Sequence, residues 1–168
     1  MTDTPPPRAT RVLPAGSWPV ASAADHITLT YDERHRRRLR FTAANGTGFL
    51  LDLARATVLR AGDGLALDDG RIVRVEAAPE PLLAVTADSP QRLLRLAWHI
   101  GNRHLPAQLQ PGRMLIREDS VIEDMLRGLG ATVEHVMEAF TPEPGAYDHH
   151  GHANVLLPGV HSHANNPA

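Results

Sequence analysis

The chain has 168 residues, a formal net charge of −2 with histidine neutral, and 42% hydrophobic residues, which is typical of a globular protein of one or two domains. It contains no cysteine and its 17 basic residues are all arginine, which excludes a disulfide framework, a thiol nucleophile, a cysteine metal site and a lysine Schiff base. The near-neutral charge argues against nucleic-acid binding, and the lack of a signal sequence or of an apolar run of ~20 residues predicts a cytoplasmic protein that does not contact membranes.

The N-terminal half shows short runs of alternating polar and apolar residues, separated by turn residues. Residues 1–25 are mostly irregular, and the alternation predicts strands at 11–13, 26–31, 34–41, 48–53, 65–67 and 71–76. The Asn45-Gly46 pair is typical of a hairpin turn, and the arginines between residues 34 and 40 are interpreted as the solvated face of a strand. Short strands at this spacing predict a small all-β domain over residues 10–78.

The pattern changes after residues 77–81, where two prolines in three residues predict a linker. The predicted order that follows is strand, helix, strand, strand, helix, strand, with strands at 82–87, 108–112, 113–117 and 131–137 and helices at 89–101 and 120–130. Ser89 before Pro90 is a helix start, and Ser120 with Glu123 forms a capping box that makes Ser120 the expected cap. This order is that of a ferredoxin-like βαββαβ domain over residues 79–140, so the whole chain is predicted to be α+β.

Residues 141–168 contain too few apolar side chains to fold alone and predict a flexible tail. This tail is rich in histidine, since five of the ten histidines lie in the last twenty residues: His149, His150, His152, His161 and His163. Neutral imidazole is a good ligand for zinc, copper and nickel, so the tail is predicted to bind metal. Because ordering a flexible chain costs entropy, moderate affinity and fast exchange are expected, which suits metal transfer. A cloning tag or a solvated tail is the alternative, although a tag would normally be an unbroken run of histidines.

Two further histidines, His99 and His104, flank the end of the first predicted helix, which Gly101 is expected to stop. A spacing of five residues across a glycine is not a standard chelating pair. His99 is explained by the favourable interaction of a cation with a helix C-terminus, while spacing alone leaves the role of His104 open. The carboxylates of Glu118 and Asp119, which precede the second helix, are interpreted as partners of the helix dipole.

Three segments together resemble the UreE family of urease accessory proteins. They are residues 101–109 (Gly-Asn-Arg-His-Leu-Pro-Ala-Gln-Leu), residues 119–126 (Asp-Ser-Val-Ile-Glu-Asp-Met-Leu) and residues 144–147 (Pro-Gly-Ala-Tyr) before the histidine-rich end. Residues 36–38, 62–65, 68–70 and 75–77 are similar to the first domain of that family. The resemblance extends from about residue 10 to residue 152.

The resemblance implies a nickel metallochaperone that delivers Ni²⁺ to apo-urease and is not an enzyme. Its first domain would be a peptide-binding-like module, and its ferredoxin-like domain would bind metal and form a homodimer. The expected partners are the urease accessory GTPase, other urease maturation proteins and apo-urease. Zn²⁺ or Cu²⁺ could replace Ni²⁺ in vitro.

The same resemblance assigns ligands to individual positions. The family histidine at the dimer centre matches His104, and the family's tail ligands map loosely onto His149, His150 and His152. Ser120 stands where many relatives have histidine, so a secondary site there is expected to be weaker or absent. A two-fold axis beside His104 would supply two imidazoles from one motif, and binding should weaken as imidazoles are protonated near pH ~6.5.

Two other functions compete with nickel delivery. One is a protein-interaction scaffold of the urease maturation complex, for which metal binding is incidental. The other is a metal-dependent hydrolase, which needs three fixed ligands beside an acid or base on a rigid element. The sequence shows no such constellation, so the hydrolase is disfavoured.

Overall fold

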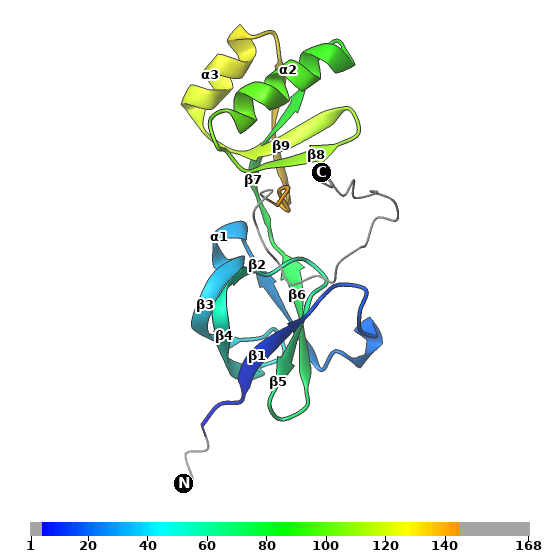
Figure 1. The fold of residues 1–168 in the computed structure, drawn as a ribbon, viewed down its shortest axis with the longest axis vertical. Helices are drawn as coiled ribbons and strands as arrows, with labels where there is room; N and C mark the ends of the chain where they lie inside the picture. The colour runs from blue at the N-terminus through cyan, green and yellow to red at the C-terminus, as the bar shows by residue number, and fades with distance from the viewer. Residues whose placement is uncertain (1–4, 145–168) are drawn as a thin grey trace, which may run out of the picture.

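The computed structural model describes residues 5–144, which form two sheets, one in each half of the chain (Figure 1). The first half contributes β1 (Arg8–Leu13), η1 (Val20–Ser22, a 3-10 turn), β2 (Asp25–Leu29), α1 (Tyr31–Arg34), β3 (His35–Thr42), β4 (Gly48–Val58), β5 (Gly64–Leu67) and β6 (Ile72–Ala77). The second half contributes β7 (Pro79–Thr86), α2 (Pro90–Gly101), β8 (Ala107–Gln110), β9 (Arg113–Arg117), α3 (Ser120–Gly128) and β10 (Thr132–Ala139). The molecule is therefore sheet-rich, with two domains and few helices. Within residues 5–144, every helix is too short or too polar to cross a membrane.

The six strands of the N-terminal sheet lie in the order β2-β6-β5-β1-β4-β3. β1 pairs with β4 and β2 with β6 in parallel, whereas the other neighbours are antiparallel. The predicted hairpin is confirmed, because residues 43–47 join β3 to β4 and Gly46 has a φ of 90°, which favours glycine. Alternate apolar residues of these strands, with Ala43 and Leu59 just beyond β3 and β4, form one core: Ala9, Ile27, Leu29, Ala43, Phe49, Leu51, Leu53, Leu59, Leu65, Leu67, Val73 and Val75.

One segment of this domain differs from the expectation of an all-β unit. The strand predicted at 26–31 ends at Leu29, and the chain then forms the one-turn helix α1. The carboxylate of Glu33 accepts hydrogen bonds from the backbone N–H and the hydroxyl of Thr30, at 2.8 and 2.9 Å. These bonds hold the pKa of Glu33 below its usual value and stabilise the turn. The one-turn helix α1 places Arg34 at the junction between the domains.

The linker predicted at 77–81 is wrong, because β6 extends to Ala77 and β7 begins at Pro79. Pro79 pairs with Ala139 and Pro81 pairs with Met137 in β10. On the opposite side of β7, pairing with β9 begins only at Leu82. Proline is tolerated at such positions because its missing N–H is not needed where one side of the strand is unpaired. The two domains are thus joined by a single residue, Ala78, between two strands of different sheets rather than by a loop.

The second domain has the element order that the sequence predicts, and its strands lie in the order β10-β7-β9-β8, all antiparallel. Both helices cover the same face of this sheet (Figure 1). The Ser89 cap is confirmed, since its side chain accepts the N–H of Arg92 at 3.2 Å and Pro90 follows it. The core between sheet and helices contains Leu83, Val85, Leu96, Ile100, Met114, Ile116, Leu126 and Val133.

The predicted cap of the second helix is wrong by one residue. Asp119, not Ser120, is the N-cap of α3, and its carboxylate accepts the N–H groups of Val121 and Ile122 at 2.9 and 3.0 Å. Ser120 is instead the first helical residue. A carboxylate can accept both bonds and also interacts favourably with the helix dipole, which explains why the aspartate occupies the capping position.

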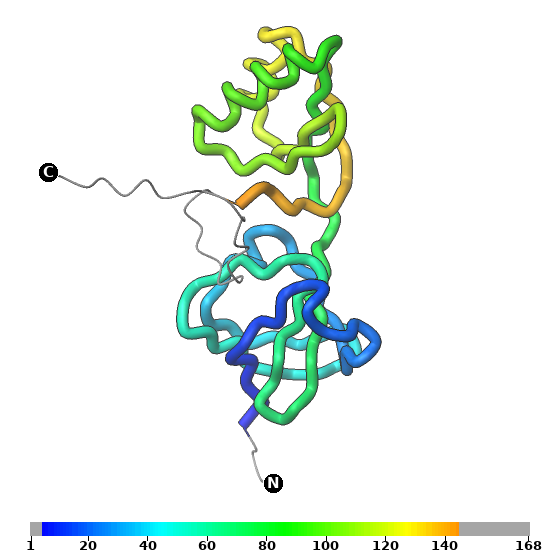
Figure 2. The backbone as a smooth tube through the Cα atoms, turned by 45° about the vertical axis from the view of Figure 1, so that its right-hand side comes forward, coloured from blue at the N-terminus to red at the C-terminus, as the bar shows by residue number. Residues whose placement is uncertain are grey.

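The opposite face of the second sheet packs against the first domain. Leu82, Ala84, Leu115 and Phe140 form a buried cluster there, and Tyr31 of α1 packs against it. The last described residues of the chain, orange in Figure 2, lie at this junction. The interpretation of residues 34–40 as a solvated face is wrong for Arg34, which is fully buried and donates hydrogen bonds to the carbonyls of Leu59 and Phe140. The two domains therefore share a packed interface.

Candidate metal site

His104 lies directly beyond the C-terminal end of α2. Three backbone hydrogen bonds hold this turn. The N–H of Asn102 donates to the carbonyl of Trp98 at 2.9 Å, and the N–H of Arg103 donates to the carbonyl of Ile100 at 3.1 Å. The N–H of His104 itself donates to the carbonyl of Gly101 at 2.9 Å. β8 then begins three residues later, at Ala107. His104 is thus carried by a short, hydrogen-bonded connection between a helix and a strand.

The backbone of His104 is in the left-handed region, with a φ of 57°, and it is the only residue other than glycine with positive φ among residues 5–144. The sequence predicts that Gly101 ends the helix. Gly101 is indeed the last helical residue, but the left-handed turn residue is His104. Because this conformation costs an L-residue roughly 1–2 kcal/mol, a glycine would relieve the backbone strain of the turn. Histidine is one of the few residues besides glycine that adopt this conformation with some frequency, so the backbone strain is compatible with a functional role for the side chain.

His104 is exposed, whereas His99 is half-buried in α2. The ring of His99 packs edge-on against Trp98, with 5.1 Å between the ring centroids. His99 also borders a hollow that is lined by the guanidinium-bearing residues Arg92 and Arg95. Two neighbouring positive charges disfavour a bound cation, so His99 remains best explained as a helix residue.

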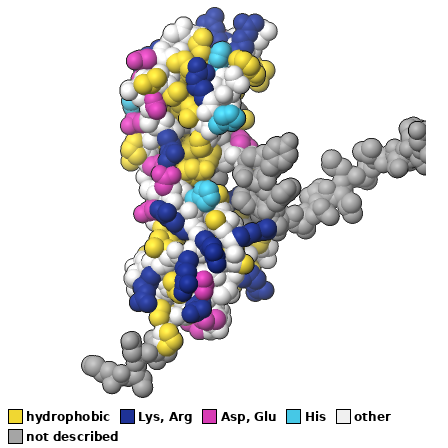
Figure 3. Space-filling model, turned by 60° about the vertical axis from the view of Figure 1, so that its left-hand side comes forward, with side chains coloured by type: hydrophobic (Ala, Val, Ile, Leu, Met, Phe, Trp, Pro, Cys, Tyr) yellow, Lys and Arg dark blue, Asp and Glu magenta, His cyan; other side chains and the backbone are white. Residues whose placement is uncertain are grey.

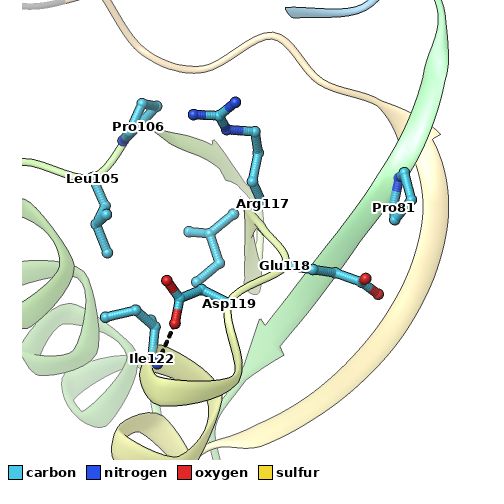
Figure 4. A pocket seen from close by; sticks show the side chains of 8 residues that line it. Pro81, Leu105, Pro106, Arg117, Glu118, Asp119 and Ile122 are labelled. Atoms are coloured by element: carbon cyan, nitrogen blue, oxygen red, sulfur yellow. Dashed lines mark hydrogen bonds between the residues drawn. The ribbon is translucent and has the colours of Figure 1, made fainter.

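A groove lies beside the two residues that follow His104. It is lined by Pro81, Leu105, Pro106, Ile116, Arg117, Glu118, Asp119 and Ile122 (Figure 4). Its charged side chains already have partners, because Arg117 forms an ion pair with Asp32 at 2.8 Å and Asp119 caps α3. Figure 4 shows the side chains of Glu118 and Asp119 turned away from each other. These carboxylates are therefore not arranged as a joint metal site.

Glu118 instead belongs to a cluster that the sequence does not predict. Nδ1 of His135, on β10, lies 2.6 Å from Glu118, and its Nε2 lies 3.2 Å from Glu123 of α3. The hydrogen bond that the His135 ring donates to the carboxylate of Glu118, with the charge of Glu123, raises the pKa of His135. An imidazolium has no free lone pair, so His135 in this state is an ion-pair partner rather than a metal ligand. The contact forms because β10 lies beside α3 in the fold, and no local sequence pattern predicts it.

Within residues 5–144, no group of three or more histidine, aspartate or glutamate side chains is arranged to hold a metal ion. The tail candidates His149, His150 and His152, together with His161 and His163, lie outside the described residues. The segment that leads to them is described as far as residue 144. In it, the N–H of Glu143 donates to the carbonyl of Ala107 at 2.8 Å, which places Glu143 beside β8, the strand that follows His104.

Comparisons with known proteins match both halves of the chain. The family model described as the UreE urease accessory protein, N-terminal domain, matches residues 9–78, and the one described as its C-terminal domain matches residues 80–167. A urease accessory protein UreE from Rhodobacter capsulatus is 57% identical over 140 residues, which cover 83% of this chain and 86% of the relative. The urease accessory protein UreE of a Bradyrhizobium strain is 55% identical over 146 residues, which cover 87% of this chain and 70% of the relative. That of a Chelativorans strain is 52% identical over 141 residues, which cover 84% of this chain and 89% of the relative.

Proposed function

Because the chain belongs to the UreE family of urease accessory proteins, we propose that it is a nickel metallochaperone that binds Ni²⁺ through histidines and delivers it to apo-urease. The family takes part in urease maturation, and the chain is an accessory protein rather than an enzyme. The observation that carries nickel binding is His104, an exposed imidazole on a left-handed residue where glycine would avoid the backbone strain. Ni²⁺ is the proposed cargo, and Zn²⁺ or Cu²⁺ would compete for the same nitrogen donors in vitro.

The proposed site is shared by two copies of the chain. A two-fold axis beside His104 would bring together two imidazoles, because a symmetric interface repeats each residue. Large apolar side chains on α2 support such an interface, since Leu94 and Trp98 are 71% and 64% exposed. They lie four residues apart and therefore on one face of the helix that ends beside His104. Burying them against a second copy would remove an unfavourable apolar surface from water.

Two imidazoles leave a nickel ion with open coordination positions. We propose that His149, His150 and His152 of the tail, together with water, fill them. The hydrogen bond between Glu143 and Ala107 supports this assignment because it places residue 143, which precedes the tail histidines, close to the segment that carries His104. The sequence predicts that the tail does not fold alone, and ligands on such a chain would bind with moderate affinity, which suits a protein that releases its metal.

The finer structural assignments belong to the same proposal. Residues 79–140 would be a ferredoxin-like dimerisation domain, and residues 10–78 would be a peptide-binding-like module. The partners would be the urease accessory GTPase, other maturation proteins and apo-urease, in the cytoplasm. The β-α-β-β-α-β order and the strand order β10-β7-β9-β8 support the first of these assignments.

A nickel titration of the purified full-length protein, with its mass in solution followed at the same time, tests this function. We expect a dimer whose high-affinity nickel site is lost in His104→Ala while the fold is retained. His99→Ala is the matched control, because it removes an imidazole from the same helix end and should leave nickel binding unchanged. If His104→Ala binds nickel with unchanged stoichiometry and affinity, or if the protein stays monomeric with nickel bound, the proposed function is wrong.

One observation favours the competing function as a scaffold. β3 is an edge strand of the N-terminal sheet, and Arg36, Arg38 and Arg40 on it are exposed. Figure 3 shows arginines gathered over the N-terminal domain, a surface that could dock an acidic partner. A pull-down of urease maturation proteins in the presence and absence of a chelator separates the two functions. A scaffold keeps all its partners in chelator, whereas a carrier that docks through its metal loses some of them.

A further inference from the structure

We propose that the free edge of β3 binds an extended acidic segment of another protein by strand addition, with carboxylates at alternate positions facing Arg38 and Arg40. The binding surface, called here the β3 edge, is defined by residues 36–41. The inference rests on the proposed assignment of residues 10–78 as a peptide-binding-like module, because it gives that module a site and a class of ligand. It does not depend on nickel binding.

The first observation is the unpaired side of the β3 backbone. β3 is the last strand of the N-terminal sheet and pairs with β4 alone. Within residues 5–144, no other backbone hydrogen bond involves an N–H or a carbonyl of residues 36–41. On the side away from β4, the strand therefore offers donors and acceptors to an incoming extended chain, which is how exposed sheet edges bind peptides.

The second observation is an excess of positive charge on the outer face of β3. Arg38 lies opposite Asp52 of β4, and Arg40 lies two residues further along β3, so both side chains belong to the same face of the sheet. Nε of Arg38 lies 3.7 Å from Asp52, but Asp52 also pairs with Arg8 at 3.1 Å. Arg40 is exposed and forms no ion pair with any residue in the described range. Three arginines thus share one carboxylate, which favours an acidic ligand.

The third observation is an exposed leucine between the two arginines. Leu39 lies opposite the fully buried Leu51, so its side chain belongs to the core face of the sheet, yet it is 42% exposed. An edge that is only protected against aggregation often carries a charge at such an inward position. An apolar side chain there leaves the margin of the core uncovered. A strand added to β3 would cover it with an apolar side chain of its own.

Strand addition accounts for the charge and for the exposed leucine together. In a chain paired with β3, alternate side chains lie beside Arg38 and Arg40, and the side chain between them lies beside Leu39. The expected ligand therefore alternates acidic and apolar residues. A nucleic acid would satisfy the charge alone, since residues 36–40 contain no aromatic side chain on which a base could stack.

The test uses a synthetic peptide of alternating glutamate and valine, whose binding to the full-length protein is followed by fluorescence anisotropy. We expect saturable binding that weakens about tenfold or more when one alternate set of its backbone nitrogens is methylated, because these N–H groups donate to β3. Methylating the other set, whose N–H groups face away from β3, should be tolerated. A peptide of the same composition, with its glutamates and valines in two separate blocks, should bind weakly.

Variants of the protein test the role of the arginines. Arg40→Glu should weaken binding of the alternating peptide about fivefold or more, because a like charge then faces its carboxylates. Arg95→Glu is the matched control, because it makes the same change in net charge at an exposed arginine of α2 and should leave binding close to that of the parent. A peptide with lysine in place of glutamate should bind Arg40→Glu more tightly than it binds the parent.

The possible results separate this inference from the proposed function. Equal affinity of Arg40→Glu and Arg95→Glu for the alternating peptide overturns the inference, as does binding that neither methylated set weakens. A single-stranded oligonucleotide of equal charge that binds as tightly as the peptide also overturns it, since charge alone would then explain the surface. Absence of binding by every peptide overturns the peptide-binding-like assignment as well. Nickel binding by Arg40→Glu should equal that of the parent, so none of these results bears on the nickel site.

Discussion

The guanidinium of Arg34, at the end of α1, donates a hydrogen bond to the backbone carbonyl of Phe140, 106 residues further along the chain. The same group donates to the carbonyl of Leu59 at 3.3 Å, and its side chain is fully buried. Burial lowers the pKa of Arg34, although Glu80 partly offsets this effect. One side chain thus connects the N-terminal sheet, the end of β10 and the origin of the tail.

Replacing Arg34 should weaken both domains together. Arg34→Ala leaves two buried carbonyls without a donor and opens a cavity, so we expect the free energy of unfolding to fall by about 2–4 kcal/mol. Denaturant unfolding followed by circular dichroism measures this change. Arg36→Ala, which removes an exposed arginine of β3, should stay within about 0.5 kcal/mol of the parent. Equal stability of the two variants would contradict the role of Arg34 at the junction.

His104→Gly should separate the stability of the fold from nickel binding. Glycine relieves the left-handed strain at φ 57° but adds entropy to the unfolded chain, so the free energy of unfolding should stay level or rise by up to about 1 kcal/mol. Nickel binding should be lost. His99→Gly, inside α2, should instead lower stability by about 0.5 kcal/mol and keep nickel binding. A marked loss of stability in His104→Gly would show that its imidazole supports the fold.

The two residues at the start of α3 should respond differently to alanine. Asp119→Ala removes the acceptor for the N–H groups of Val121 and Ile122 and should lower the free energy of unfolding by about 1 kcal/mol. Ser120→Ala changes an exposed first-turn residue and should have almost no effect. Thermal unfolding of the two variants measures the difference, and the reverse ranking would restore the serine as the cap.

The ion pairs of His135 predict a pH dependence of stability. Because the pKa of His135 is raised in the folded protein, its contribution is fully present below the unfolded pKa near 6.5 and is lost as the pH rises through the higher folded value. Unfolding measured between pH 5 and pH 9 should therefore show a decline at neutral to alkaline pH that is reduced in His135→Gln. Glu118→Gln should reduce it as well, and high salt should do so in the parent, because the pair is exposed. A decline that persists in both variants would assign it to other groups.

Local patterns in the sequence determined most of the element types, though not the one-turn helix α1, as well as the hairpin at Asn45-Gly46, the helix that starts after Ser89 and the place of His104 after that helix. These features depend on side chains within a few residues of each other, so they can be predicted from the sequence alone. The role of His104 as a ligand came from the family resemblance and stays a prediction.

Only the tertiary structure decided the burial of Arg34, the start of β7 at Pro79, the pairing of His135 with Glu118 and the position of Glu143 beside Ala107. Each of these depends on segments that lie far apart in the sequence: Arg34 meets Phe140 across the junction, and Glu143 meets Ala107 across the edge of a sheet. Such contacts form only when the sheets are assembled, because their energy comes from desolvation and hydrogen bonding between elements rather than from the conformational preference of any one residue.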